Sequence, residues 1–224
     1  MEFGDFYTEA LAPDTINEAL RLCDAYLGQG IHSRANLERI ICNPLHHFDF
    51  IRYSARAAAG PHALAEAGAL VGICYCYAGT AREVADGLHI PRETILEVAP
   101  PTPADSAGRP ETLYGACRSV ALLERFRGTG LARVLLDAYT DVMFGKDGVA
   151  AAFCVAWIRG NAIPAHAQLS SCGFERICII EHPWSQVEDL TCPECHHQPC
   201  ICDGILYAKT RDAYLAGLAS EAGN

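Results

Sequence analysis

The apolar positions between residues 119 and 142 change their spacing at a short glycine-containing turn. Val120 and Leu122 alternate with other residues, as in a β-strand, before the sequence Arg-Phe-Arg-Gly-Thr-Gly at 125–130. After the turn, apolar side chains recur at the spacing of one helical face: Leu131, Val134, Leu135, Ala138 and Val142. This pattern predicts a strand, a tight turn and a helix in direct succession.

Capping residues and apolar spacing also predict the helices and strands before and after this stretch. Thr15 and Glu18 form a capping-box pattern near the start of a helix over 13–27, and Ser33 caps a second helix that ends before Pro44. Alternating or continuous apolar runs predict strands over residues 48–57, 69–78, 111–120, 149–157, 174–181 and 205–209, followed by a closing helix in 210–224.

Residues 79–110 lack this regularity. A short helix is predicted over 80–88 and an extended piece over 95–98, ahead of a proline-rich loop. We interpret the segment as an insertion before the central strand that acts as a lid. We expect the whole chain, 1–224, to form one domain.

The composition indicates a soluble domain with reduced cysteines. A chain of 224 residues with 50% hydrophobic content can bury one substantial core. No run approaches the roughly 20 apolar residues that span a bilayer, and the first residues lack a signal-peptide pattern, so we expect a cytoplasmic protein. Without such a signal, the 12 cysteines indicate free thiols, some of them metal ligands. The formal net charge of -10 argues against nucleic acid or an anionic membrane as partner, and slightly favours a cationic substrate.

The turn between the predicted strand and helix has the features of an anion site. Gly128 and Gly130 allow the backbone to approach a ligand, and the first amides of the helix lack partners within it. Arg125 and Arg127 add positive charge. The three-glycine dinucleotide fingerprint and the Gly-Lys-Ser/Thr triphosphate loop are both missing from this stretch. The turn therefore predicts a site for another phosphate-bearing cofactor.

The spacing around this turn resembles motif A of the GCN5-related N-acetyltransferase (GNAT) superfamily. The motif, Val-x-x-x-x-Gln/Arg-x-x-Gly-x-Gly/Ala, is met by Val120, Arg125, Gly128 and Gly130. The resemblance implies an α/β (α+β) fold: a mixed, mostly antiparallel sheet of six or seven strands flanked by helices. It also implies that acetyl-CoA lies in a notch where the central strand and the next one splay apart. The cofactor residues that it implies are Val120, Ala121, Arg125, Phe126, Arg127, Gly128, Thr129, Gly130, Leu131, Ala132 and Asn161.

A second family motif, motif B, resembles residues 158–174, with Asn161 near its start and Gly173-Phe174 at its end. The place where many members carry a tyrosine general acid holds Leu169 here. Many members also carry a glutamate on the central strand, on the same face as Val120. Strict alternation makes Tyr114 the nearest equivalent, so Tyr114 is the candidate catalytic residue. The alternative is that Tyr114 simply packs.

A cysteine-rich stretch near the C-terminus has the spacing of a zinc site. Cys192 and Cys195 form a Cys-x-x-Cys turn, and Cys200 and Cys202 follow closely. Four thiolates satisfy tetrahedral zinc and leave no position for water. We therefore expect a structural Zn²⁺ that orders the loop 183–203.

Two alternatives stay open at this loop. Cys192 and Cys195 could instead form a redox pair. His196 or His197 could replace one cysteine as ligand, or could stand beside the metal as an acid or base.

Together with the resemblance, these residues predict transfer of an acetyl or related acyl group from acetyl-CoA to a primary amine. The acidic charge and the zinc-ordered loop favour a small-molecule amine as the partner. A protein lysine or N-terminal acetyltransferase would share every cofactor residue. A non-catalytic acyl-CoA sensor, or a protein that docks partners through its zinc loop, would account for the missing tyrosine. The acceptor, the acyl length and the oligomeric state stay open, and a homodimer is one option.

Overall fold

Eight strands form one continuous sheet within the part of the chain that the structure describes. The structure is a computed structural model that describes residues 1–59, 65–101 and 111–222. The strands are β1 (Glu2–Phe3), β2 (Phe6–Ala10), β3 (His46–Tyr53), β4 (Leu70–Gly79), β5 (Tyr114–Leu122), β6 (Ala151–Trp157), β7 (Glu175–Ile180) and β8 (Gly204–Thr210). Their order is β1-β2-β3-β4-β5-β6-β8-β7, and every neighbouring pair is antiparallel except β5 and β6.

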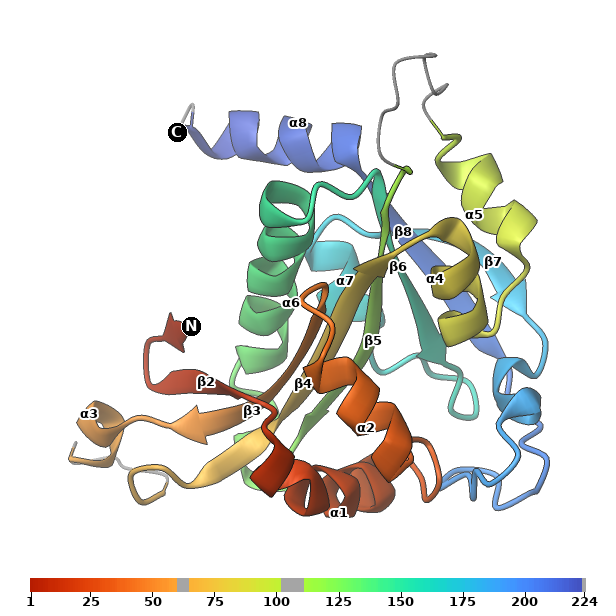
Figure 1. Cartoon of the computed structure of the whole chain (residues 1–224). Helices are drawn as coiled ribbons and strands as arrows, with labels where there is room; N and C mark the ends of the chain where they lie inside the picture. The colour runs from red at the N-terminus through yellow and green to blue at the C-terminus, as the bar shows by residue number, and fades with distance from the viewer. Residues whose placement is uncertain (60–64, 102–110, 223–224) are drawn as a thin grey trace.

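Helices cover both faces of this sheet (Figure 1). One face carries α1 (Ile16–Tyr26), α2 (Arg34–Ile41), α4 (Ala81–Leu88) and α5 (Arg92–Val98), and the other carries α6 (Leu131–Asp141) and α7 (His166–Ser171). The remaining helical segments are η1 (Pro13–Thr15), α3 (Ala55–Ala58), η2 (Glu124–Phe126), η3 (Val142–Lys146), η4 (Pro183–Gln186) and α8 (Arg211–Ala222). Each face has its own apolar cluster, because alternate side chains of the central strands point to opposite sides. A ligand that touches both faces must therefore pass between two strands.

The expected fold class is confirmed, with corrections to individual elements. The sheet has eight strands rather than six or seven, because the first ten residues add two short strands, β1 and β2, at one end of it. Residues 95–98, expected to be extended, belong to α5, which buries Ile95 and packs against α4. The helix expected within 158–174 is limited to α7, and residues 159–162 form a turn instead. None of the described helices is long and apolar enough to cross a membrane.

The described part of the expected insertion forms a layer of the fold. α4 begins at a capping box made by Thr80 and Glu83, and it buries Val84 and Leu88 in the cluster under its face of the sheet. Residues 102–110 lie outside the described residues. The lid role therefore stays a prediction, while 81–98 are packed on the sheet.

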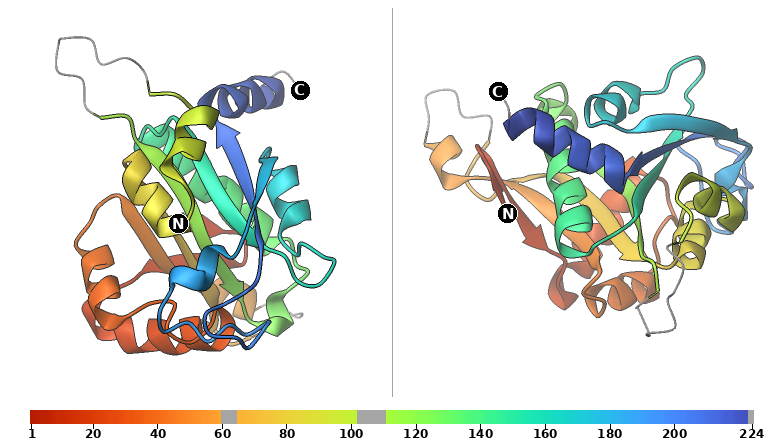
Figure 2. Two further views of the ribbon diagram at one scale, coloured as in Figure 1. Left: turned by 90° about the vertical axis from the view of Figure 1, so that its right-hand side faces the viewer. Right: turned by 90° about the horizontal axis from the view of Figure 1, so that it is seen from above.

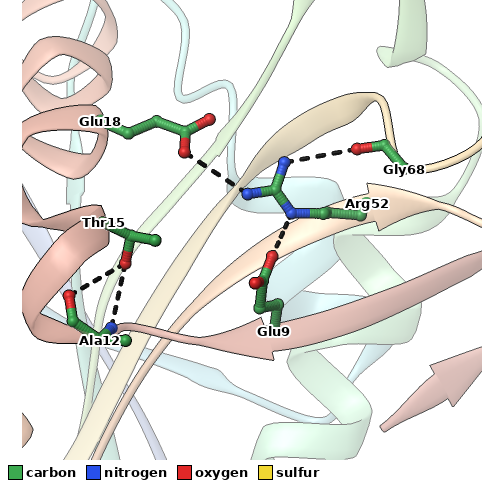
Figure 3. A network of polar contacts seen from close by, with 6 residues as sticks. All are labelled: Glu9, Ala12, Thr15, Glu18, Arg52 and Gly68. Carbon is green, nitrogen blue, oxygen red and sulfur yellow. Dashed lines mark hydrogen bonds and ion pairs between the residues drawn. The ribbon is translucent and has the colours of Figure 1, made fainter.

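The start of α1 is held differently from the expected capping box. The Thr15 hydroxyl accepts a hydrogen bond from the Ala12 amide at 3.0 Å and makes none with Glu18 (Figure 3). Glu18 instead forms an ion pair with Arg52 of β3 at 3.4 Å (Figure 3). Arg52 also forms an ion pair with Glu9 of β2. One guanidinium serves both carboxylates, so Arg52 ties α1 and β2 to the third strand.

Candidate functional site

The central strands β5 and β6 part soon after they begin. They pair in parallel only at Gly115 with Ala152 and at Ala116 with Phe153, and no further pairing joins them. A cavity of about 480 Å³ fills the gap, with walls from α1 and α4 on one face and from α6 and α7 on the other. After the groups expected from the sequence, we call the wall from α1 and α4 the amine side and the wall from α6 and α7 the cofactor side. The cavity lies where the expected notch was placed.

The turn before α6 places backbone amides that have no hydrogen-bond acceptor in the described structure next to the cofactor side. Gly128 and Gly130 have φ values of 75° and 81°. A residue with a side chain would adopt this backbone conformation only with strain. Within the described residues, the amides of Gly128, Thr129 and Gly130 donate no hydrogen bond, and α6 begins at Leu131 without a side-chain cap. Such amides and the positive end of the helix dipole attract anions. The turn is suited to a phosphate group.

The expected cofactor residues divide into two groups. Those that line the cavity are Val120, Ala121, Arg127, Gly128 and Ala132. Those that do not line it are Arg125, Phe126, Thr129, Gly130, Leu131 and Asn161. Phe126 and Leu131 are buried in the core, Arg125 lies over the Phe126 ring, and Asn161 is exposed in the turn before α7. None of these six residues contributes a side chain to the cavity wall.

A β-bulge in β5 overturns the alternation that made Tyr114 the candidate base. The pairing of β5 with β4 shifts by one residue at Arg118, so Val120 shares a face with Cys117 and not with Tyr114. Tyr114 is 1% exposed, and its hydroxyl donates to the Ala99 carbonyl at 2.9 Å. It does not line the cavity. Its location favours the packing alternative, and a catalytic role stays a prediction.

Three buried polar atoms in the cavity wall have no partner. They are His89 Nε2, Trp157 Nε1 and Gln168 Oε1, and the structure leaves only one other such side-chain atom, His32 Nε2, among the described residues. Buried polar groups are almost always hydrogen-bonded, and each one left alone costs about 1–3 kcal/mol. Their concentration in one cavity indicates a site that a polar ligand completes.

His89 and Arg118 set the electrostatics of the amine side. Arg118, the bulge residue, donates to the Gly87 carbonyl at the end of α4. His89 follows α4 with a left-handed backbone, at a position that glycine often occupies. Burial, together with the nearby Arg118 guanidinium, lowers the pKa of His89 to about 4. The imidazole is therefore neutral near pH 7.

Sequence reasoning missed these residues of the amine side. His89, Arg118 and Trp157 come from different elements, and no motif spans them. The one local signal was His89 directly after a capped helix, where a histidine must adopt the strained left-handed conformation. Residues held in this way are often held for a function.

The four cysteines of the C-terminal loop meet at one point. The Sγ atoms of Cys192, Cys195, Cys200 and Cys202 all lie within 4.8 Å of one another, with 3.8 Å from Cys192 to Cys202 and 3.9 Å from Cys195 to Cys200. All four are free thiols. Tetrahedral zinc with bonds of about 2.3 Å requires sulfur atoms about 3.8 Å apart. The donor set fits that ion, and no histidine belongs to the cluster among the described residues.

The loop 183–203 packs against α1 and the amine side. The Thr191 amide donates to the Gln29 carbonyl at 3.0 Å, beyond the end of α1, and Figure 2 shows the loop beside this helix. Leu190 is fully buried, and Trp184 packs on Trp157 with ring centres 4.6 Å apart. Both tryptophans line the cavity. The cysteine cluster and the cavity therefore share one wall.

The sequence matches no protein-family model and no curated protein. Solved structures do match the fold. NAA60 of Arabidopsis thaliana in complex with acetyl-CoA has a TM-score of 0.60 at 12% identity, over 92% of this chain and 99% of its own. The same protein in complex with a bisubstrate analogue has a TM-score of 0.61 at 11% identity, over 92% and 97%.

A second similar structure is a bacterial enzyme. Spermidine N-acetyltransferase from Vibrio cholerae, in complex with CoA and spermine, has a TM-score of 0.55 at 12% identity, over 95% of this chain and 99% of its own. At such identities the likeness concerns the fold alone. It shows that the chain has the GNAT-like architecture over nearly its whole length.

Proposed function

We propose that this protein is an N-acetyltransferase that transfers an acetyl group from acetyl-CoA to the primary amine of a small molecule. The observation that carries the proposal is the cavity between β5 and β6, which reaches from the amides without partners before α6 to the unpartnered His89 Nε2 at the end of α4. Its volume of about 480 Å³ is in the range of small-molecule sites. The similarity to structures that bind acetyl-CoA, or CoA and spermine, supports the same chemistry.

The cofactor side suits acetyl-CoA, which supplies an acetyl group activated as a thioester when bound. The amides of Gly128 and its neighbours, together with Arg127, would hold the phosphates. Gln168 Oε1 can accept a hydrogen bond from an amide N–H of the pantetheine arm. Val120 is the one exposed residue of β5, at 38%, and offers apolar surface to the same arm.

The amine side favours a neutral amine, which is the form that can attack. The Arg118 guanidinium raises the free energy of a second cation nearby, so it would lower the pKa of an amine bound beside it. Neutral His89 can accept a hydrogen bond from that amine through Nε2. Leu169 lines the cavity and has no proton to give, so α7 supplies no general acid from this position. Positioning and charge would provide most of the rate enhancement.

We propose further that the four clustered cysteines bind a structural Zn²⁺. The fit of their Sγ separations to a tetrahedral ion supports this assignment. Four thiolates would leave the ion no open position, so its role would be to order the loop 183–203 against α1.

Acetyl-CoA titration with two matched variants tests the transferase. Val120→Glu would place a carboxylate in the notch and should weaken binding about tenfold or more, equal to about 1.4 kcal/mol or more. Val134→Glu is the control, because Val134 is 44% exposed on α6 and does not line the cavity. Release of free CoA with a panel of amines then tests turnover. Unchanged binding in Val120→Glu, or binding without turnover of any amine, would contradict the proposal.

Metal analysis with two cysteine variants tests the zinc site. The wild-type protein should contain about one zinc per chain, and Cys195→Ser should release it because three thiolates leave the ion incompletely bound. Cys42→Ser is the control, since Cys42 is exposed and lies outside the cluster. A Cys195→Ser protein that keeps its full zinc content would refute the assignment.

A further inference from the structure

The amine side of the cavity is cationic. None of the described residues that line the cavity is an aspartate or glutamate, and the charged ones are Arg118, Arg127 and Arg159. Arg127 belongs to the turn before α6, and Arg159 pairs with Glu194 of the loop 183–203 at 3.8 Å. Arg118 is therefore the cation left for a ligand on the amine side. This local charge is opposite to the formal net charge of -10 for the chain.

Arg118 lacks an acidic partner although it is half-buried. Its described contact is the hydrogen bond to the Gly87 carbonyl, and no carboxylate among the described residues pairs with it. Burial, and to a smaller extent the Arg118 charge, lowers the pKa of His89 and of His32 to about 4 in each case, so Arg118 lies near both rings. Even a half-buried guanidinium loses hydration that no counter-ion in the described part of the chain replaces, and a bound carboxylate would offset this loss through two parallel hydrogen bonds.

The rest of the amine side is apolar, with one spare donor. Tyr26, Leu27 and Ile31 form one wall, and the packed rings of Trp157 and Trp184 form another. The unpartnered Nε1–H of Trp157 can only donate a hydrogen bond. This wall suits an apolar or aromatic body and offers a second donor to an anionic group.

We infer that the acceptor is an α-amino acid with an apolar or aromatic side chain, whose carboxylate pairs with Arg118 and whose side chain packs against the two tryptophans. The inference rests on the proposed transferase activity and names its substrate class. It disfavours polyamines, because a second or third ammonium group would meet Arg118 with no carboxylate nearby in the described lining.

Matched amines that differ only in the carboxylate test this inference. L-Phenylalanine and 2-phenylethylamine share the ring and the amine, and spermidine represents the polyamines. We expect kcat/KM for L-phenylalanine to exceed that for the other two by about tenfold or more, which corresponds to about 1.4 kcal/mol. Arg118→Met should reduce the preference for phenylalanine over phenylethylamine to near one, mainly through KM. Arg118→Lys should keep part of the preference, since lysine retains the positive charge but cannot make two parallel hydrogen bonds to a carboxylate.

The controls separate this inference from the proposed activity. Arg82→Ala removes an exposed arginine of α4 that does not line the cavity, and it should leave the preference unchanged. Acetyl-CoA affinity should stay unchanged in Arg118→Met, which also verifies folding. Equal or greater rates with phenylethylamine or spermidine, with intact acetyl-CoA binding, would overturn the inference alone. A wild-type protein that does not bind acetyl-CoA would overturn the proposed function, and the inference with it.

Discussion

Arg127→Ala gives the sharpest measure of how this protein would bind a phosphate. Arg127 is exposed at the end of η2, and its Nε donates to the Leu122 carbonyl at 3.1 Å. That bond fixes the guanidinium next to the unfilled amides and leaves its two terminal nitrogens without another partner in the described chain. A hydrogen bond to a charged group contributes about 1.5–3 kcal/mol, and exposure to solvent reduces this contribution. We expect a loss of about 1–3 kcal/mol, or about 5- to 150-fold in Kd for acetyl-CoA.

Calorimetric titration of acetyl-CoA at two salt concentrations would measure this loss. Arg133→Ala is the matched control, because it removes the same charge from α6, where Arg133 pairs with Asp137 at 3.8 Å and does not line the cavity. The Kd of Arg127→Lys should fall between those of wild type and Arg127→Ala, since lysine keeps the charge but not the paired donors of the guanidinium. The difference between Arg127→Ala and wild type should shrink at high salt. An unchanged Kd, or an equal loss in Arg133→Ala, would refute the phosphate contact.

Two further predictions concern buried side chains. Burial lowers the pKa of His32 to about 4 from an ordinary 6.5, so the unfolded chain binds a proton between these values that the folded chain does not. Stability should therefore fall by about 2 kcal/mol through His32 from pH 7 to pH 5, and urea unfolding of His32→Leu should show a correspondingly flatter pH dependence. Tyr114→Phe loses a buried hydrogen bond to a backbone carbonyl, so it should cost about 1 kcal/mol of stability and leave kcat unchanged. A lower kcat of Tyr114→Phe across the pH range would instead support a catalytic role for the Tyr114 hydroxyl.

The parts of the fold that follow from local patterns were predictable. The succession of β5, the glycine turn and α6 was read from apolar spacing, and the turn needs positive φ at Gly128 and Gly130, which glycine supplies. The cysteine cluster was predictable for the same reason, because its four cysteines lie within eleven residues of sequence, 192–202. Short-range constraints leave few alternative geometries.

The errors came from features that neighbouring strands and helices impose. The bulge at Arg118 has no mark in the apolar pattern, yet it reverses which side chains share a face with Val120. The short apolar run at 95–98 predicts an extended piece, whereas these residues belong to α5, which packs against α4. The amine side depends on the bulge, which places Arg118 beside the end of α4. Its charge could not be read from composition.

The position of the cysteine loop explains why zinc would matter for the amine and little for the cofactor. Trp184, within that loop, packs on Trp157 of β6, and Arg159 pairs with Glu194 between Cys192 and Cys195. Both contacts lie on the amine side or at its edge. The amides before α6 belong to the opposite face, which has its own apolar cluster. If the loop binds zinc as proposed, loss of the metal would loosen the wall proposed for the amine, while the glycine turn proposed for phosphate would keep its support.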